Sequence, residues 1–256
     1  MSVQPEEAIE LIGSAGERYD TVRATLRYRG DGPTIKAVRE RFLRSESARR
    51  TFGDLASGPP EPIQHAEPDG PFGWRVRVWR VDQHRWRREL ELPGGGLEIT
   101  VSTGRVRLRA TPDEPPGTPE VWERRIGGGR RSDDPGWLMG TDFFWTMYPF
   151  DPGDIAGVDG QLGRLDLVAE GPVTWAGREA VRLRGVPVEE WEGPPEPLWW
   201  GADEYEAVVD AERGVVLRLA SRLGGEDFDA LEVEEIHFDE RFPEDTFASR
   251  EPLPWR

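Results

Sequence analysis

The sequence predicts an α+β fold, in which a large antiparallel sheet of about 9–11 strands carries two to four helices on one face. Two observations lead to this prediction. From residue 73 onward, apolar and charged side chains alternate with a period near two over most of the chain, as in strands with one buried face. Helical spacing is confined to two segments near the N-terminus. With 256 residues, a single domain over residues 1–256 is expected.

The two helical segments flank a strand. The first, PEEAIELIGSA, has a proline suited to a first helical turn and two glutamates that complement the helix dipole, and it ends before Gly16. The second, residues 35–50, places apolar side chains at helical spacing. Between them, residues 22–29 alternate apolar and polar side chains, which indicates a strand.

The later strands are separated by turn and loop signals. Hairpin turns are expected at Thr103-Gly104, at Ala176-Gly177 and within the sequences DAERG and GGED. The segments RLDLVAEG and PVTWAGREAVRLRGV are read as successive strand segments. Residues 111–135 are expected to form a long polar loop with at most one helical turn around 121–126, and residues 186–203 a proline-rich loop.

The width of such a sheet limits how the helices can cover it. Ten strands spaced by about 4.8 Å span roughly 48 Å, whereas one helix covers roughly 10–12 Å. We therefore expect the sheet to curl around its helices, leaving an apolar concave face that is suited to binding a ligand.

Composition excludes several functions. The formal net charge is −16, so nucleic acid is not expected as a partner, because phosphate binding depends on lysine and arginine. There are no cysteines, which excludes disulfides, thiolate metal sites and cysteine nucleophiles. No run approaches the roughly 20 apolar residues of a membrane span. The first twenty residues do not resemble a secretory signal, so a cytoplasmic location is expected, or an extracytoplasmic one if a leader has been removed.

The charge is unevenly distributed. Residues 74–109 contain nine arginines and four acids, whereas residues 189–256 contain twenty acids and six arginines. One interpretation is that these strands lie in one sheet and pair their charges across strands. The other is an arginine-rich face that meets an anionic partner.

Several segments resemble the lipoprotein-localisation fold family, the LolA/RseB-like family. They are the helix-to-strand sequence AIELIGSAGERYDTVRATLRYR, the basic aromatic segment around Arg85, Trp86 and Arg87, the hairpin STGRVRLRA, the pair PVTWAGREAVRLRGV and VDAERGVVLRLAS, and the ending IHFDERFPEDTF. The resemblance covers most of the chain and rests on pattern and turn placement. It implies an unclosed half-barrel with helices on its concave side and a lining that accepts acyl chains or a hydrophobic partner segment. The absence of an export signal departs from the family's carriers.

The sequence contains no recognisable catalytic or metal-binding motif. Of the three histidines, only His237 has close acids, and a strand would place it on the same face as Asp239, but no further ligands follow at a known spacing. The GGG runs at 94–96 and 127–129 lack the lysine and serine of a P-loop. We therefore expect no enzymatic activity, no cofactor and no metal.

The segment GWLMGTDFFWTMYPF, residues 136–150, holds six aromatic residues and two methionines. It is interpreted either as a core helix that fills the concave face or as part of a ligand pocket or its lid. In the second interpretation, the ligand-binding residues are Trp74, Trp86, Trp137, Leu138, Phe143, Phe144, Trp145, Met147, Tyr148 and Phe150. In a proline-flanked loop, Trp199 and Trp200 are expected to contact a partner protein.

These observations predict a non-enzymatic binding protein that holds a lipid, an acyl chain or a hydrophobic partner segment against its concave face. The alternative is a regulatory protein–protein interaction module of the RseB type, which would use an acidic C-terminal surface and the Trp199-Trp200 loop.

Overall fold

The computed structural model describes 4–44, 69–82, 85–91, 97–103, 107–110, 120–122, 150, 162, 165–188 and 201–248 of the chain. The described elements are α1 (Pro5–Gly13), η1 (Ala15–Glu17), β1 (Val22–Asp31), α2 (Gly32–Leu43), β2 (Pro71–Arg80), β3 (Arg85–Glu91), β4 (Leu97–Thr103), β5 (Arg107–Ala110), β6 (Glu120–Trp122), β7 (Leu165–Trp175), β8 (Arg178–Pro187), β9 (Glu204–Asp210), β10 (Val216–Leu223), β11 (Glu226–Phe238) and η6 (Glu244–Phe247).

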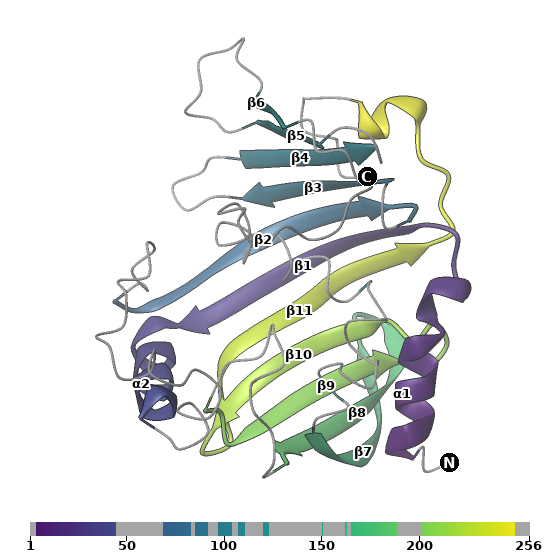
Figure 1. The fold of residues 1–256 in the computed structure, drawn as a ribbon. Helices are drawn as coiled ribbons and strands as arrows, with labels where there is room; N and C mark the ends of the chain where they lie inside the picture. Colours follow the sequence, from purple (N-terminus) through teal and green to yellow (C-terminus); the bar gives the residue numbers. More distant parts are fainter. Residues whose placement is uncertain are drawn as a thin grey trace. The chain divides into compact units, whose positions relative to one another are not determined.

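The strands form an 11-stranded sheet in the order β6-β5-β4-β3-β2-β1-β11-β10-β9-β8-β7 (Figure 1). The registers from β2 to β6 and from β11 to β7 are antiparallel. The sheet is open, with β6 and β7 at its two ends. The predicted α+β class and the predicted unclosed antiparallel sheet are confirmed.

Local signals fix both helices. The backbone N–H of Gln4 donates to the Glu7 carboxylate at 3.0 Å, so one free N–H at the start of α1 is satisfied. Asp31 caps α2 by accepting from the Thr34 backbone N–H at 3.1 Å. The predicted position of the second helix is confirmed, but α2 ends at Leu43, and 45–68 lie outside the described residues.

Three hairpins turn where the sequence predicted, and one of them, within DAERG, joins β9 to β10. Ala176 and Gly177 both have positive φ, 48° and 75°, and join β7 to β8 with Trp175 opposite Arg178. Gly224 and Gly225, also at positive φ, join β10 to β11. The segments read separately as RLDLVAEG and PVTW are one strand, β7, with a register shift between Ala169 and Gly171.

The helical turn predicted around residues 121–126 is wrong at its start, because Glu120–Trp122 form strand β6. Pairing with β5 creates this strand, with Val121 opposite Leu108. The flanking sequence shows no alternation that could have indicated it.

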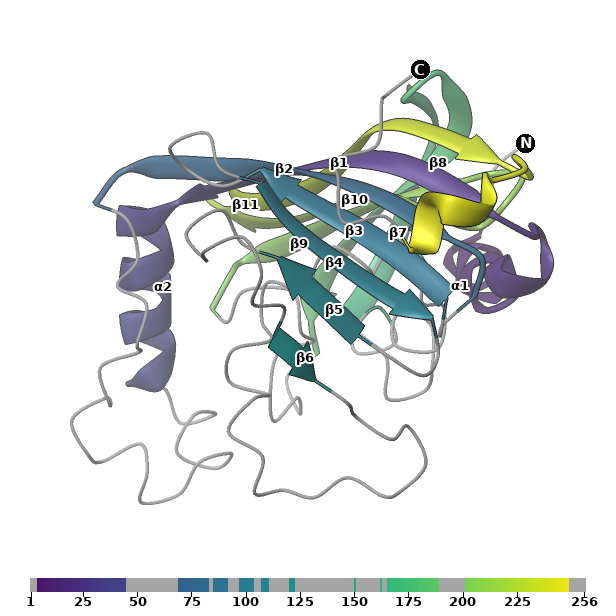
Figure 2. The ribbon, with the colours of Figure 1, turned by 90° about the horizontal axis from the view of Figure 1, so that it is seen from above.

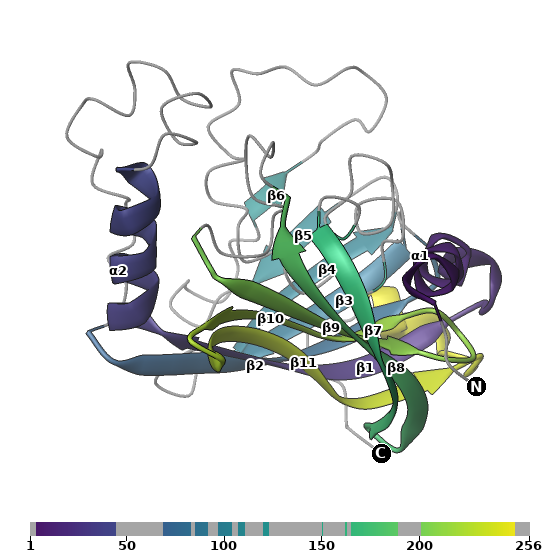
Figure 3. The ribbon, with the colours of Figure 1, turned by 90° about the horizontal axis from the view of Figure 1, so that it is seen from below.

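The chain divides by its contacts into two compact units. The first comprises residues 1–18, 28–73 and 148–232, and the second comprises 19–27, 74–147 and 233–256. In the first unit, α1, α2 and one face of the strands share an apolar core, and α1 contacts β7 (Figure 3). This core contains Ala8, Ile12, Ile35, Val38, Leu162, Leu165, Val181, Leu183, Ala202, Tyr205, Ala207, Val209, Val216, Leu219 and Phe228.

The second unit has a smaller core on β2 to β4. Trp79, Ile99 and Val101 pack with Phe247 of the C-terminal turn η6, which lies beside β3 and β4 (Figure 2). Phe242 packs against the same cluster, with its ring centroid 5.9 Å from that of Phe247. The C-terminal segment therefore covers one face of these strands.

Candidate functional site

In the second unit, the registers of β2, β3 and β4 show which side chains share the face opposite η6. Residues directly opposite each other in an antiparallel ladder point to the same side of the sheet. The rows on this face, in the order β2, β3, β4, are Val76, Leu90 and Glu98; Val78, Arg88 and Thr100; and Arg80, Trp86 and Ser102. We call this the Trp86 face.

Two of the residues predicted to bind a ligand lie on the Trp86 face. Trp86 is buried, with 4% of its surface exposed. Trp74 is half-buried, and the alternation of β2 places it on the same side as Val76 and Val78. Both valines are also buried, so the face combines two indoles with aliphatic side chains.

The Trp86 face also contains buried charge. Arg88 forms an ion pair with Glu98 at 2.5 Å, and both side chains are about 5% exposed or less. The same Glu98 oxygen accepts from the Thr100 hydroxyl at 3.4 Å. Because a buried charge is tolerated only when it is paired, this contact keeps the face compatible with an apolar neighbour.

On the opposite face of these strands, Glu89 pairs with Arg77 and Arg87, and we call these three residues the Glu89 cluster. The Glu89 carboxylate pairs with Arg87 at 2.6 Å and with Arg77 at 2.5 Å, and both Arg87 and Glu89 are fully buried. Arg87 also donates to the backbone carbonyl of Thr246 at 3.3 Å, and the Arg85 guanidinium lies 4.7 Å from the centroid of Phe247. These contacts attach η6 to the sheet.

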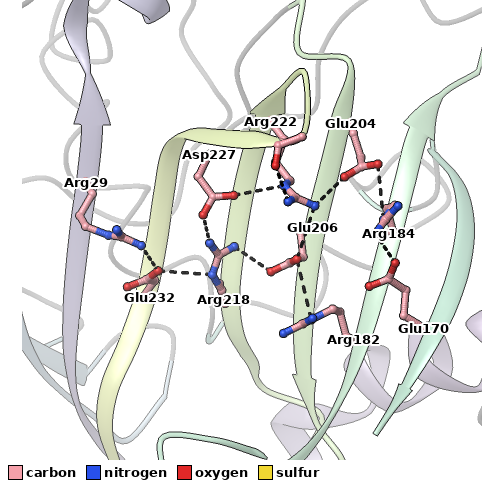
Figure 4. Close-up of polar contacts among 11 residues, drawn as sticks. Arg29, Glu170, Arg182, Arg184, Glu204, Glu206, Arg218, Arg222, Asp227 and Glu232 are labelled. Atoms are coloured by element: carbon pink, nitrogen blue, oxygen red, sulfur yellow. Dashed lines mark hydrogen bonds and ion pairs between the residues drawn. The ribbon is translucent and has the colours of Figure 1, made fainter. Parts of the chain in front are cut away.

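In the first unit, one sheet face meets the helices and the other is ionic. On the helix side, the buried Tyr28 hydroxyl donates to the buried Asp229 carboxylate, and the Tyr28 ring lies 5.8 Å from that of Phe72. The opposite face carries a series of ion pairs that runs from β1 to β7 (Figure 4). This ion-pair belt consists of Arg29, Glu232, Arg218, Asp227, Arg222, Glu206, Arg182, Glu204, Arg184 and Glu170.

Arg218 is the centre of the belt. It pairs with Glu206 at 2.9 Å, with Asp227, and with Glu232 at 3.3 Å, and its side chain is 6% exposed. The Trp175 ring lies against it, with a centroid distance of 5.4 Å. The belt and the Glu89 cluster support the interpretation in which arginines and acids pair across strands.

Two pKa shifts accompany these contacts. The hydrogen bond to Asp210, aided by the negative charges of Asp210 and Glu212, raises the pKa of Arg178, although partial burial opposes the shift. Burial raises the pKa of Tyr205 well above its ordinary value, and the nearby charge of Asp203 adds to the shift. Tyr205 therefore stays neutral at any physiological pH.

The other predicted site residues fall into two groups. Phe150 is buried, at 1% exposure. The remaining ones, Trp137, Leu138, Phe143, Phe144, Trp145, Met147, Tyr148, Trp199 and Trp200, lie outside the described residues.

Residues that directly follow the tryptophan pair are described. Gly201 adopts a positive φ of 83°, and a Cβ there would lie 3.0 Å from the Val38 carbonyl oxygen of α2. Arg41 of α2 donates to the Gly201 carbonyl and pairs with Asp203 at 3.0 Å. The chain leaving Trp200 is therefore fixed to the C-terminal part of α2.

No metal site is found among the described residues, since no group of three or more histidine and acidic side chains is close enough to hold an ion. His237 lies 2.6 Å from Glu235 and 3.7 Å from Glu240. The expectation that Asp239 would share its face is wrong, because β11 ends at Phe238 and Asp239 accepts from the Asp20 backbone N–H at 2.8 Å. In the described part of the chain, no helix is both long and apolar enough to cross a bilayer.

Comparison with known families and with curated proteins finds no match. Solved structures do show similarity. The MucA/MucB complex of Pseudomonas aeruginosa has a TM-score of 0.48 at 14% identity, covering 95% of this chain and 60% of that chain. Lipoprotein LppX of Mycobacterium tuberculosis has a TM-score of 0.45 at 10% identity, covering 92% and 95%. A LolA superfamily protein of Nitrosomonas europaea has a TM-score of 0.31 at 10% identity, covering 96% and 98%.

The likeness concerns the fold. In the three structures that contain MucB, the chain spans 59–62% of the length of the chain that it matches.

Proposed function

We propose that this protein is a non-enzymatic binding protein that holds an apolar ligand, a lipid or acyl chain, or a hydrophobic partner segment, against the Trp86 face. The observation that carries the proposal is the composition of that face. Half-buried Trp74 and buried Val76 and Val78 lie on one side of β2, and buried Trp86 lies on the same side of β3, opposite Arg80. Indole rings provide a large apolar contact area with little loss of conformational freedom.

Charge pairing supports the same choice. The Arg88–Glu98 pair leaves no net charge between its two members, so an alkyl chain lying beside it would not strand a buried ion. By contrast, the ion-pair belt of the first unit offers charged and hydrogen-bonding groups, which suit water better than an acyl chain. Of these two faces, the Trp86 face therefore suits an apolar guest.

Trp74 provides the test, because it is half-buried and its replacement leaves the buried side chains of the face in place. Palmitate and lysophosphatidylcholine would be titrated into the delipidated full-length protein, with native mass spectrometry reporting stoichiometry and tryptophan fluorescence reporting affinity. We expect binding of at least one probe, weakened about tenfold or more by Trp74→Ala, because several methylene contacts are lost.

Arg75→Ala is the matched control, since Arg75 is the next residue, is exposed and points to the other side of β2. It should leave the affinity unchanged. The proposal is wrong if neither probe binds, if solvent extraction of freshly purified protein yields no lipid, or if the two substitutions weaken binding equally.

A regulatory protein-interaction module is the second candidate, and the anchoring of Gly201 and Asp203 by Arg41 favours it. This contact would hold the base of the Trp199-Trp200 segment firmly enough to present it to a protein. The acidic C-terminal residues favour it less, because Glu204, Glu206, Asp227 and Glu232 already pair with arginines. A pull-down in which the double substitution Trp199→Ala and Trp200→Ala retains every partner would exclude this role for the segment.

A further inference from the structure

Exposed apolar side chains gather at one place in the first unit. Among the described residues, the large hydrophobic side chains that are exposed are Val168, Val186 and Val188, at 60%, 44% and 43%. Val168 lies opposite Arg184 in the β7–β8 register, and Asp166 lies opposite Val186. Val168, Asp166 and Val186 therefore point to one side of the sheet, and Val188 directly follows β8. We call this group the valine strip.

Of the valine strip, Asp166 and Val168 lie on the edge strand β7, whereas Val186 lies on the next strand, β8. In the strand order β7 is the last strand, and within the described part of the chain it pairs with β8. The second half of β7 contains features that discourage further pairing, namely the register shift before Gly171 and then Pro172, which has no N–H to donate. Residues 165–169 have neither feature, so their outer edge is suited to receive another strand.

Within the described part of the chain, one carboxylate of the strip has no opposite charge beside it. Glu170 pairs with Arg184, which also pairs with Glu204 at 3.4 Å, so the belt is neutralised up to its end on β7 (Figure 4). Asp166 is exposed and makes no ion pair with any described residue. On this face of β7, an incoming strand would meet the apolar Val168 beside the negative charge of Asp166.

We propose that residues 165–169 bind an extended segment of another protein by strand addition, and that this segment alternates apolar and basic side chains. Backbone hydrogen bonds to the edge of β7 would provide affinity, Val168 would contact an apolar side chain, and Asp166 would pair with a lysine or arginine. This proposal does not depend on the Trp86 face.

A second copy of this chain fits the strip less well. Antiparallel pairing of two β7 strands centred on Val168 sets Asp166 of one copy opposite Glu170 of the other, and like charges directly opposite are unfavourable. Centring on Leu167 sets Asp166 opposite Val168, which would bury its carboxylate without a partner. The charges of β7 therefore favour a basic partner over self-association.

The test uses the full chain and two synthetic peptides with blocked ends, one alternating valine and lysine and the other alternating valine and glutamate. Fluorescence anisotropy would measure affinity, and amide hydrogen exchange would locate the contact. We expect the lysine peptide to bind and to slow exchange at residues 165–169. Val168→Lys should weaken it about tenfold or more, because an apolar contact is replaced by a like charge.

Asp166→Lys should weaken the lysine peptide by about fivefold or more and improve binding of the glutamate peptide, since a favourable cross-strand charge pair becomes a repulsive one. Two controls match these changes. Thr174→Lys adds a charge on the opposite side of the same strand, and Glu179→Lys reverses a charge at an exposed site on β8. Both control variants should bind the lysine peptide as tightly as the unmodified protein does. That result would show that the peptide recognises residues 165–169 and is not simply attracted by the chain's net charge of −16.

Three results would overturn the proposal. The first is equal weakening of peptide binding by the strip variants and their controls. The second is protection from exchange that falls outside β7. The third is a dimer, detected by analytical ultracentrifugation, that Val168→Lys dissociates, because it would identify a second copy as the occupant.

Discussion

Two regions of this protein contain arginines and acids at alternate positions, yet they place those charges in different surroundings. In the ion-pair belt of the first unit, the arginine side chains range from 6% exposed at Arg218 to 48% at Arg29. In the Glu89 cluster of the second unit, Arg87 and Glu89 are both fully buried. The difference arises from what covers each region, because the Thr246 carbonyl of η6 accepts a hydrogen bond from Arg87, and the Phe247 ring of η6 lies against Arg85 on the same face.

The comparison shows that one sequence pattern serves two physical purposes. Exposed pairs keep a wide sheet face compatible with water and add little to stability individually. Buried pairs add little net stability as intact units, but the loss of one partner strands a charge in a medium of low dielectric constant. The sensitivity of an ion pair to substitution should therefore rise as its exposure falls.

The largest effect is expected at the Glu89 cluster. Glu89→Gln removes the carboxylate that serves both Arg87 and Arg77, and it should lower the free energy of unfolding by about 3–5 kcal/mol. Urea denaturation measures this change. Replacing Arg87 and Glu89 together by methionine should recover a substantial part of the loss, because no charge is then stranded. If the double variant is as unstable as the single one, the stranded charge is not the cause.

An intermediate effect is expected at the centre of the belt. Arg218→Met leaves Glu206, Asp227 and Glu232 without their shared arginine, and it should lower the free energy of unfolding by about 1.5–3 kcal/mol. The same urea experiment applies. A loss equal to that of Glu89→Gln would show that partial exposure does not moderate the effect.

A pH experiment extends the comparison from buried ion pairs to a buried neutral group, the Tyr205 hydroxyl. The unfolded Tyr205 loses its proton near pH 10, whereas the folded residue, with its raised pKa, retains it. Above pH 10 the unfolded state is therefore favoured, and the free energy of unfolding should fall by up to about 1.4 kcal/mol per pH unit. Tyr205→Phe should flatten this slope relative to the unmodified protein, and Tyr19→Phe, at a half-buried residue, is the control.

The smallest effect is expected where the belt reaches the edge. Arg184→Met removes an arginine that is 45% exposed, and it should change the free energy of unfolding by about 0–1 kcal/mol, with the difference shrinking further at high salt. If the free energy of unfolding falls by more than that, or if the loss does not depend on salt, the ion pairs of Arg184 behave like buried ones and exposure does not set the effect.

The parts of the fold that were predicted from the sequence depend on neighbouring residues. The start of α1 follows from Pro5 and the glutamates after it, and the β7–β8 turn follows from Ala176-Gly177. The alternation of β1 identified Val22, Ala24, Leu26 and Tyr28 as its buried side. Each of these features is decided within a few residues, so periodicity and turn chemistry were sufficient.

The features that were missed depend on distant residues. Strand β6 exists because β5 pairs with it. The Tyr28–Asp229 contact joins residues 201 positions apart. A period of two shows that Arg87 and Glu89 share a face, but it cannot show that η6 closes over that face. For the candidate site, alternation placed Trp74 with Val76 and Val78, whereas the Arg88–Glu98 pair required the register of β3 and β4.

Photo-crosslinking would show where on the protein an apolar ligand binds, and so whether it lies against the Trp86 face. A palmitate analogue carrying a diazirine near the end of its chain would be bound to the full-length protein, irradiated and mapped by peptide mass spectrometry. If the ligand lies against the Trp86 face, the labels should fall within residues 74–90, and both excess palmitate and Trp74→Ala should reduce them. Labels confined to the ion-pair belt of β7 to β11, or labelling that excess palmitate does not reduce, would contradict binding at the Trp86 face.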